Sequence, residues 1–222
     1  MIKESGPLSF SGFMELALYQ EEFGYYTDPT RTRVGQTGDF ATSVSVGATY
    51  GRLLALRIHQ VWEAHGNPRV FPVLEPGPED GSLALDILRA AREQDPAFHQ
   101  ALHYTACEPG TRKREALANR FAATGEPNLR VVAAPAEAKA EWGIVLANEV
   151  LDALPVHLVR WSGSSWQEMF VGLESEKLAW TIAPCSDSPL SLHLAKLPTD
   201  LPEGYTTEVC LELFPFLKEL AA

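Results

Sequence analysis

Short apolar segments alternate with helix-forming segments between residues 70 and 147, and this alternation constrains the fold more than any other feature. The apolar runs at residues 70–74, 104–107, 129–133 and 144–147 are expected strands, and helical stretches begin at Ser82 and pass through Leu117. Strands and helices at this spacing predict an α/β fold with a parallel sheet built from βαβ units. Right-handed crossovers then place the carboxyl ends of the strands along one edge of the sheet, where ligands bind.

The segments on either side of this region have different patterns. Apolar residues at positions 10, 13, 14, 17 and 18 predict a helix that ends near Gly24, and a second helix is expected through residues 46–61. Residues 27–49 between them form a long polar loop, of a length that is commonly functional. Residues 155–183 predict an antiparallel meander, and residues 208–220 a helix. We therefore divide the chain into 1–66, a helical region with a lid loop; 67–154, the parallel-sheet core; and 155–222, the meander and C-terminal helix.

Charge and cysteine content limit the possible partners and compartment. The 18 Lys and Arg residues against 29 Asp and Glu give a net charge of −11, which argues against a nucleic-acid partner and suits a cationic peptide. The three cysteines form no C-x-x-C pair, and no signal peptide or membrane-spanning run is recognised, so we expect a cytoplasmic protein without a membrane anchor. His99 and His103 lack a third ligand, so no metal site is expected. The oligomeric state is left open.

The turn after the first of these strands carries the strongest local signal. Residues 74–83 contain a strand end, a turn with Gly77 and Gly81, and a helix start. Glycines let a backbone approach a ligand closely, and a helix N-terminus offers unpaired N–H groups. Glu75 at the strand end would repel a pyrophosphate but suits the amino group of an amino-acid-bearing nucleotide. Glu108 ends the next strand and can accept hydrogen bonds from both hydroxyls of a ribose.

Two further groups of polar residues are candidates for the same edge of the sheet. Asn148 and Glu149 follow the last strand, and Asp152 comes three residues later. The two carboxylates could orient a guanidinium group through bidentate hydrogen bonds. Gly38 and Asp39 lie in the long loop, where they could close over a bound cofactor.

Each of these groups also has a purely structural interpretation. Glu75, Gly77 and Glu108 fit an ordinary βα turn with solvated acids, and Asn148 fits a helix cap with acids in the first helical turn. Residues 38–43 likewise fit the capped start of a helix. A dinucleotide-dependent enzyme is disfavoured because Glu79 stands two positions after Gly77, so the G-x-G-x-x-G pattern is missing.

Taken in order, these motifs resemble the MidA-like family of class I S-adenosylmethionine-dependent methyltransferases. The stretches that carry the resemblance are residues 6–19, 24–26, 38–43, 75–83, 148–156 and 208–210. The resemblance implies a Rossmann-like cofactor-binding core and S-adenosylmethionine as the cofactor. It also implies transfer of a methyl group to a protein arginine side chain, because the mitochondrial member is a protein arginine methyltransferase that assists complex I assembly.

The resemblance also implies roles for particular residues. Glu75, Gly77 and Gly81 surround the methionine part of the cofactor, and Glu108 holds its ribose. Asn148 and Glu149 face the reacting centre, while Gly38 and Asp39 close over it. We add from the residues themselves that Glu149 and Asp152 are the catalytic acids, since they can hold a guanidinium and help to remove its proton.

Two departures from the family pattern leave a second function open. Glu79 replaces the middle glycine of the turn, and Asp80 replaces an arginine, so a side chain and extra negative charge enter the expected site. In addition, core strands that follow residue 208 in relatives are expected to be missing. The alternative is therefore a degenerate, non-catalytic interaction or assembly module that keeps the methyltransferase fold.

Overall fold

The computed structural model describes residues 2–27, 47–185 and 188–221, which form two compact units. One unit comprises Met1–Asp28 and Leu151–Lys218, and the other comprises Pro29–Val150 and Glu219–Ala222. The N-terminal segment thus groups with the C-terminal sheet rather than forming a region of its own with the following helix. The physical reason is strand pairing, because Leu8–Ser9 hydrogen bonds to a strand of that sheet.

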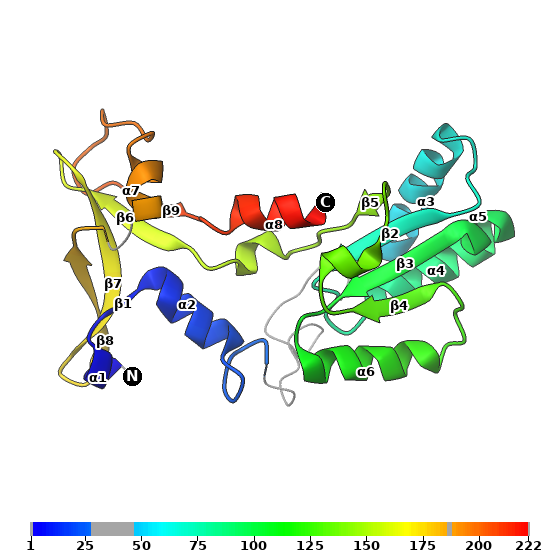
Figure 1. Cartoon of the computed structure of the whole chain (residues 1–222), viewed down its shortest axis with the longest axis horizontal. Coiled ribbons are helices and arrows are strands. Elements are labelled where there is room, and N and C mark those ends of the chain that lie inside the picture. Colours follow the sequence, from blue (N-terminus) through cyan, green and yellow to red (C-terminus); the bar gives the residue numbers. More distant parts are fainter. Residues whose placement is uncertain (1, 28–46, 186–187, 222) are drawn as a thin grey trace. The chain divides into compact units, whose positions relative to one another are not determined.

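The second unit contains the predicted parallel sheet. Its strands are β2 (Phe71–Pro76), β3 (Leu102–Cys107), β4 (Leu129–Val132) and β5 (Ile144–Val145), in the order β4-β3-β2-β5 (Figure 1). All three pairings are parallel, which confirms the α/β prediction. The chain runs outward from β2 to β4 and then crosses to the other side of β2. The carboxyl ends of β2 and β5 therefore flank the point where the strand order reverses, the usual place for a ligand in such sheets.

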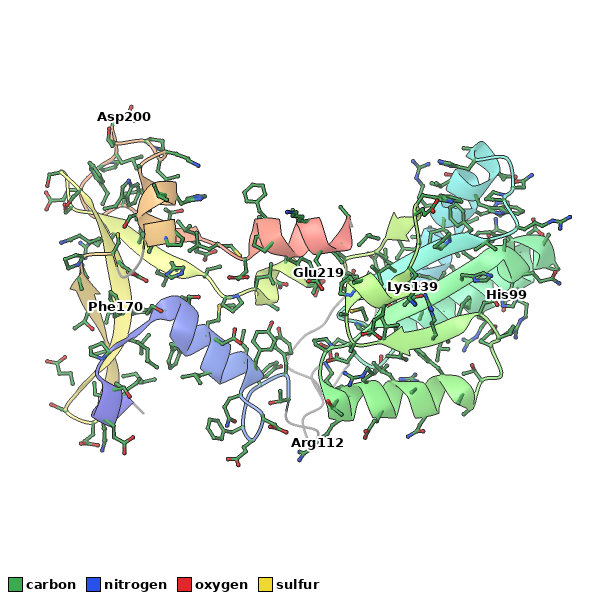
Figure 2. All side chains as sticks on the ribbon, viewed as in Figure 1. His99, Arg112, Lys139, Phe170, Asp200 and Glu219 are labelled. Carbon is green, nitrogen blue, oxygen red and sulfur yellow. The ribbon has the colours of Figure 1, made fainter. Side chains whose placement is uncertain are left out.

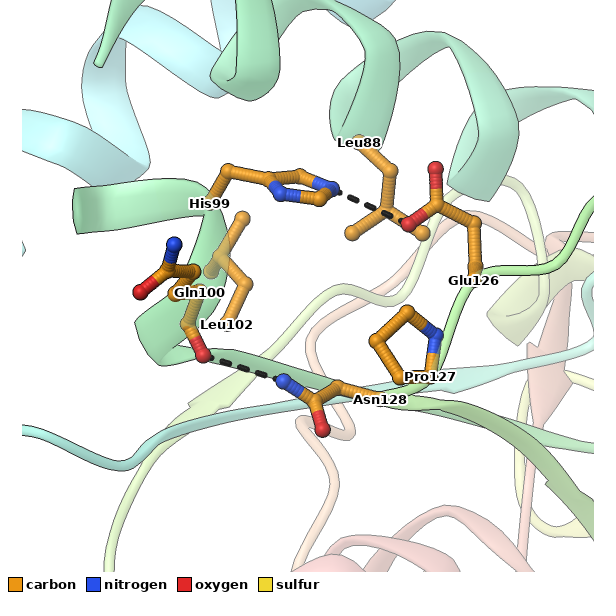
Figure 3. Close-up of a pocket in the computed structure, with 7 residues that line it drawn as sticks. All are labelled: Leu88, His99, Gln100, Leu102, Glu126, Pro127 and Asn128. Atoms are coloured by element: carbon orange, nitrogen blue, oxygen red, sulfur yellow. Dashed lines mark hydrogen bonds and ion pairs between the residues drawn. The ribbon is translucent and has the colours of Figure 1, made fainter. Parts of the chain in front are cut away.

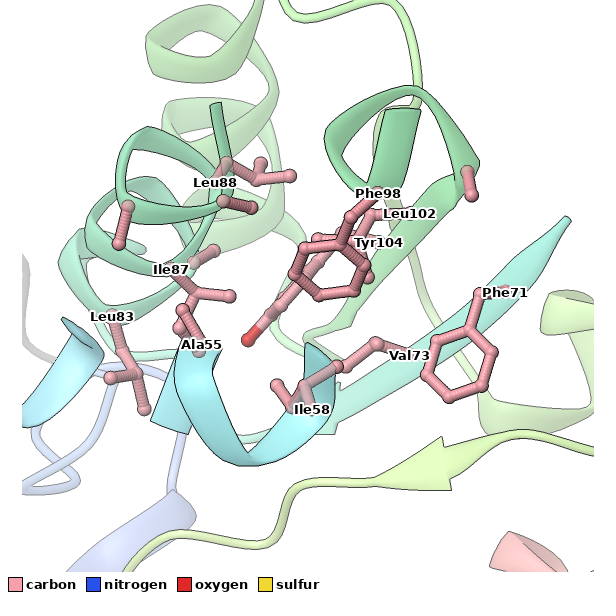
Figure 4. Packing of buried hydrophobic residues seen from close by; sticks show 14 of the residues in the cluster. Ala55, Ile58, Phe71, Val73, Leu83, Ile87, Leu88, Phe98, Leu102 and Tyr104 are labelled. Carbon is pink, nitrogen blue, oxygen red and sulfur yellow. The ribbon is translucent and has the colours of Figure 1, made fainter. Parts of the chain in front are cut away.

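The helices of this unit are α3 (Thr49–Ala64), α4 (Ser82–Gln94), α5 (Pro96–Ala101), α6 (Thr111–Ala122) and the short 3-10 helix η1 (Pro135–Ala138). Ala55 and Ile58 of α3 and Ile87 of α4 belong to one buried cluster with Val73 of β2 and Tyr104 of β3 (Figure 4). The sequence analysis missed α5, although Asp95 caps it by accepting hydrogen bonds from Ala97 and Phe98 N–H. Proline at its first position completes an ordinary helix start.

The first unit contains the predicted antiparallel meander. It consists of β6 (His157–Trp161), β7 (Trp166–Glu174) and β8 (Lys177–Ala183), to which β1 (Leu8–Ser9) and β9 (Thr206–Val209) are added. β7 pairs with β8 along its length and with β6 and β1 at different residues. Val159 and Val209 of this sheet are buried against Leu190 and Leu194.

The remaining helices are α1 (Ile2–Ser5), α2 (Phe10–Tyr19), η2 (Leu151–Ala153), α7 (Ser188–Leu194) and α8 (Leu213–Leu220). The start of α2 fits the prediction, since the Ser9 hydroxyl accepts from Gly12 N–H. The expectation of one helix over residues 208–220 is wrong at its start, because Glu208 and Val209 belong to β9 and pair with β6. In Thr206–Val209, exposed residues alternate with less exposed ones, and two of the four residues are threonines, which favours a strand. None of the described helices is long and apolar enough to cross a bilayer.

Gly81, at the start of α4, lets α6 pack against the turn after β2. Its φ is +77°, and an added Cβ would lie 2.5 Å from Cε1 of Phe121 and 3.0 Å from a methyl of Leu117. Both side chains are buried on α6. The glycine therefore removes a steric clash and permits left-handed backbone at one position.

We expect Gly81→Ala to destabilise the protein by about 2–4 kcal/mol, because it adds overpacking to backbone strain. The free energy of unfolding from urea denaturation measures the effect. Gly125→Ala is the matched control, since Gly125 also has positive φ, +70°, but has no atom near its Cβ position. The control should lose about 1 kcal/mol. Equal losses in the two variants would contradict the packing role of Gly81.

Candidate functional site

Two acidic residues lie at the carboxyl ends of neighbouring strands. Glu75 is the penultimate residue of β2, and Glu108 directly follows β3. Pro76 pairs with Cys107, and Gly77 N–H continues the ladder by donating to the Cys107 carbonyl at 3.1 Å. The structure thus brings both predicted acids to one edge of the sheet, beside the glycine turn.

Glu75 is the most unusual ionisable group at this edge. Its side chain is buried, with 3% of the residue exposed, and it accepts a 3.0 Å hydrogen bond from the Tyr104 hydroxyl. Burial raises the pKa of Glu75 from 4.5 to about 7, against the lowering effect of the Tyr104 bond, and the negative charge of Asp80 raises it further. A cation bound beside this carboxylate would reverse the shift.

The raised pKa of Glu75 also costs stability at neutral and higher pH. Between pH 4.5 and about 7 the folded protein keeps a proton on Glu75 that the unfolded chain has released. Stability therefore falls as pH rises through this window, by roughly 3 kcal/mol for a shift of this size. A buried acid with a raised pKa at the edge of such a sheet is a candidate for a ligand-binding group.

The turn after β2 has left-handed backbone at three positions before α4, namely Gly77, Glu79 and the Gly81 described above. Gly77 has φ +65°, and a Cβ there would approach Cγ2 of Val150 to 3.1 Å. Glu79 has φ +47°, which is uncommon for a residue with a side chain. Gly77 thus meets a real backbone requirement, whereas Glu79 adopts the same region at some cost in strain.

Asp80 is exposed, but its charge is compensated by neighbouring groups. Its carboxylate accepts hydrogen bonds from Ser82 N–H at 3.0 Å and from the Ser82 hydroxyl at 2.8 Å, and it pairs with Arg120 at 2.7 Å. Burial alone would raise the pKa of Asp80, but the bonds from Arg120 and Ser82 outweigh it and lower the pKa. The extra acid noted in the sequence therefore stabilises the start of α4.

Glu108 is held by two groups of the β3–α6 connection. Its Oε1 accepts from Gly110 N–H at 2.8 Å, and its Oε2 lies 3.2 Å from Nζ of Lys113. Lys113 also lies 3.7 Å from Oε2 of Glu79, so one ammonium group joins the two turns. The sequence analysis missed Lys113. A signal was present, since a lysine in the first turn of a helix faces the unfavourable end of the helix dipole.

Asn148 follows β5 and is held by α3. Its Oδ1 accepts a 3.0 Å hydrogen bond from the Tyr50 hydroxyl. From the sequence, Tyr50 was expected only to lie within the helix through residues 46–61, and its contact with Asn148 was not foreseen. The alternative of Asn148 as an α-helix cap is not what the structure shows, because the next element is the three-residue helix η2.

The other predicted site residues are less constrained. Glu149 is exposed and has φ +47°. Asp152 lies in η2 and falls in the other unit, so a joint role with Glu149 stays a prediction from sequence. The side chains of Phe121 and Leu117 occupy the space beside Gly81, and the role of Gly81 toward a cofactor is likewise a prediction. Gly38 and Asp39 lie outside the described residues.

This donor set fits an adenosyl cofactor with an amino-acid tail. The buried carboxylate of Glu75 suits an ammonium group, and that of Glu108 suits a ribose diol. No group of three or more metal-ligating side chains occurs in the described part of the chain. A small cavity of about 50 Å³ lies at the opposite end of the strands, lined by residues including His99 and Glu126, which pair at 3.0 Å (Figure 3). That cavity is therefore separate from the two strand-end acids.

Comparison with known proteins agrees with this geometry. Residues 53–222 match the family model described as "Putative S-adenosyl-L-methionine-dependent methyltransferase". The mitochondrial protein arginine methyltransferase NDUFAF7 homolog of Drosophila melanogaster is 28% identical over 95% of this chain and 52% of its own length. The bovine protein arginine methyltransferase NDUFAF7 is 28% identical over 83% of this chain and 47% of its own length. The chain thus spans about half the length of these relatives.

A solved structure is similar over the whole chain. The crystal structure of a Burkholderia thailandensis protein bound to S-adenosyl-homocysteine superimposes with a TM-score of 0.77 and 28% identity. The match covers 99% of this chain and 56% of that one. Since the family model also spans well over half of the sequence, the chain belongs to the family of S-adenosyl-L-methionine-dependent methyltransferases.

Proposed function

We propose that this chain binds S-adenosylmethionine at the carboxyl ends of β2 and β3 and transfers its methyl group to an arginine side chain of a protein. The observation that carries the proposal is the burial of Glu75 at the end of β2. Burial raises the pKa of this carboxyl group, so a bound cation would stabilise its ionised form. Membership of a methyltransferase family and the names of the arginine methyltransferase relatives support the reaction.

Each residue at the strand ends has a distinct task toward the cofactor. Glu75 pairs with the ammonium of the methionine part, and the gain is large because the carboxylate is already desolvated. Gly77 lets the backbone of the turn approach the ligand without a Cβ. Glu108 accepts from the ribose hydroxyls. When bound, the cofactor supplies a methyl group on a positively charged sulfur.

Two acids that are close in sequence are the candidates for binding the methyl acceptor. Glu149 and Asp152 would hold a guanidinium with a nitrogen lone pair aimed at the methyl group and would accept the proton that is released. The net charge of −11 favours a cationic protein or peptide as the acceptor.

One argument for a degenerate, non-catalytic module is the extra negative charge in the turn, and cations of the chain itself neutralise that charge. The extra acids in the turn are each compensated, Asp80 by Arg120 and Glu79 by Lys113. Glu79 and Asp80 therefore do not leave free negative charge beside the expected cofactor. Free negative charge in the turn is therefore no argument against a cofactor at this site.

The affinity for S-adenosyl-homocysteine should depend on pH through Glu75. Since binding requires the ionised carboxylate and its pKa in the free protein is about 7, the affinity at pH 6 should be about tenfold lower than at pH 8. Isothermal titration calorimetry at the two pH values measures the ratio. Glu75→Gln keeps an acceptor for Tyr104 but carries no charge. The variant should bind the ligand at least 30-fold more weakly at pH 8, because it loses a buried charged hydrogen bond worth roughly 2 kcal/mol or more. Its affinity should not depend on pH. Equal wild-type affinities at the two pH values would contradict this role.

The proposed catalytic acids are tested by methyl transfer. Glu149→Gln with Asp152→Asn should lower the turnover of an arginine-rich peptide by about a hundredfold or more, while the affinity for S-adenosyl-homocysteine stays within about twofold. Transfer of an isotopically labelled methyl group to the peptide gives the turnover. Glu141→Gln with Asp200→Asn removes two exposed acids and serves as the charge-matched control.

Full turnover in the Glu149 and Asp152 double variant would remove these acids from the mechanism. The absence of both labelled peptide and cofactor binding in the wild-type protein would contradict the proposed function as a whole.

A further inference from the structure

Lys113 connects the two turns that border the proposed cofactor site. We propose that it is an affinity-determining residue, which, tethered by Glu79, occupies the ribose-binding carboxylate of Glu108 and weakens the binding of adenosyl ligands. We call Lys113 with its two carboxylate partners the lysine strap. The inference rests on the proposed function and names a regulation of that same site.

The position of the ammonium group is the first observation. Nζ of Lys113 lies 3.2 Å from Oε2 of Glu108 and 3.7 Å from Oε2 of Glu79. The Lys113 side chain is 19% exposed and that of Glu108 only 7%, so this ion pair is largely shielded from water. Shielded pairs are screened less than surface pairs and are harder to displace.

The second observation is the occupancy of the Glu108 carboxylate. Oε1 already accepts from Gly110 N–H at 2.8 Å, and Oε2 faces Lys113. Each oxygen keeps a second lone pair, so a ribose diol would share this carboxylate with the donors already there. Because the backbone N–H of Gly110 cannot move away without changing the turn, the Lys113 ammonium is the donor with which a ribose must compete for Oε2.

The backbone of Glu79 is consistent with a constraint on its side chain. Glu79 has φ +47°, a conformation that glycine adopts without strain. A strained residue with a charged side chain at a ligand site indicates a functional constraint on that side chain. Oε2 of Glu79 lies 3.7 Å from Nζ of Lys113.

The location of Lys113 on α6 supports the same conclusion. It is the third residue of a helix that begins at Thr111, where the helix dipole is unfavourable for a cation. The helix itself therefore does not hold the ammonium in place. Glu79 and Glu108 supply the attraction, so removing Lys113 should not weaken α6.

The test compares two ligands that share the ribose. S-adenosyl-homocysteine carries the ammonium and the diol, whereas 5′-methylthioadenosine carries only the diol. Lys113→Met should bind both ligands about tenfold more tightly than the wild-type protein at pH 8, because Glu108 is then free to accept from the ribose. Isothermal titration calorimetry gives both Kd values.

Arg112→Met is the matched control for loss of a positive charge from the same helical turn. Arg112 is exposed at the start of α6 (Figure 2), and its replacement should change neither Kd by more than about twofold, as expected for a screened surface charge. Glu79→Gln provides a second variant that loosens the tether without touching Glu108. It should tighten binding of both ligands by a smaller factor and add nothing to the effect of Lys113→Met.

The outcomes separate this inference from the proposed function. If the wild-type protein binds both ligands and Lys113→Met binds them equally or more weakly, the lysine strap is wrong while the proposed function stands. If neither the wild-type protein nor Lys113→Met binds either ligand, the strap and the proposed function both fail. Tighter binding in Lys113→Met and in Glu79→Gln, with Arg112→Met unchanged, supports the strap.

Discussion

The burial of one carboxylate at the end of a central strand is the interaction on which the site depends. Glu75 is desolvated by the packing of β2 and β3 over the core, and among the described residues its carboxylate accepts a hydrogen bond from the hydroxyl of the buried Tyr104. This arrangement raises the pKa of Glu75 to about 7, and a cation bound beside the carboxylate would lower that pKa and favour the ionised form. Above pH 7 the fold is less stable with this ionised acid than it would be with a neutral group in the same place. Binding of a ligand to the folded protein restores the lost stability.

The rest of the site follows from the order of the strands. Because β2 lies between β3 and β5, the turn after β2, the acid after β3 and Asn148 after β5 all emerge at one edge of the sheet. Tyr50 on α3 and Lys113 on α6 then reach this edge from helices. This edge of the sheet therefore carries charges of both signs. Lys113 forms an ion pair with Glu79 of the turn, and Arg120 forms one with Asp80.

Hydrophobic periodicity was enough to predict the parallel sheet, the helices α3, α4 and α6 and the meander, since each pattern has a distinct period, but it missed the short α5. It failed for Glu208 and Val209, where strand pairing with β6 overrides a helical reading of the tail. It was also enough to select Glu75 and Glu108, which end neighbouring strands. Lys113 and Tyr50 were missed because both act through long side chains that reach other elements, and the place of Lys113 in the first turn of a helix was the one local signal.

The pKa of the Glu75 carboxyl group tests the central claim most directly. Carbon-13 NMR of the labelled side chain, titrated with and without S-adenosyl-homocysteine, reports it at a single atom. We predict a pKa of about 7 in the free protein and a value well below that in the complex. A pKa near 4.5 in the free protein, or one that the ligand leaves unchanged, would contradict the account.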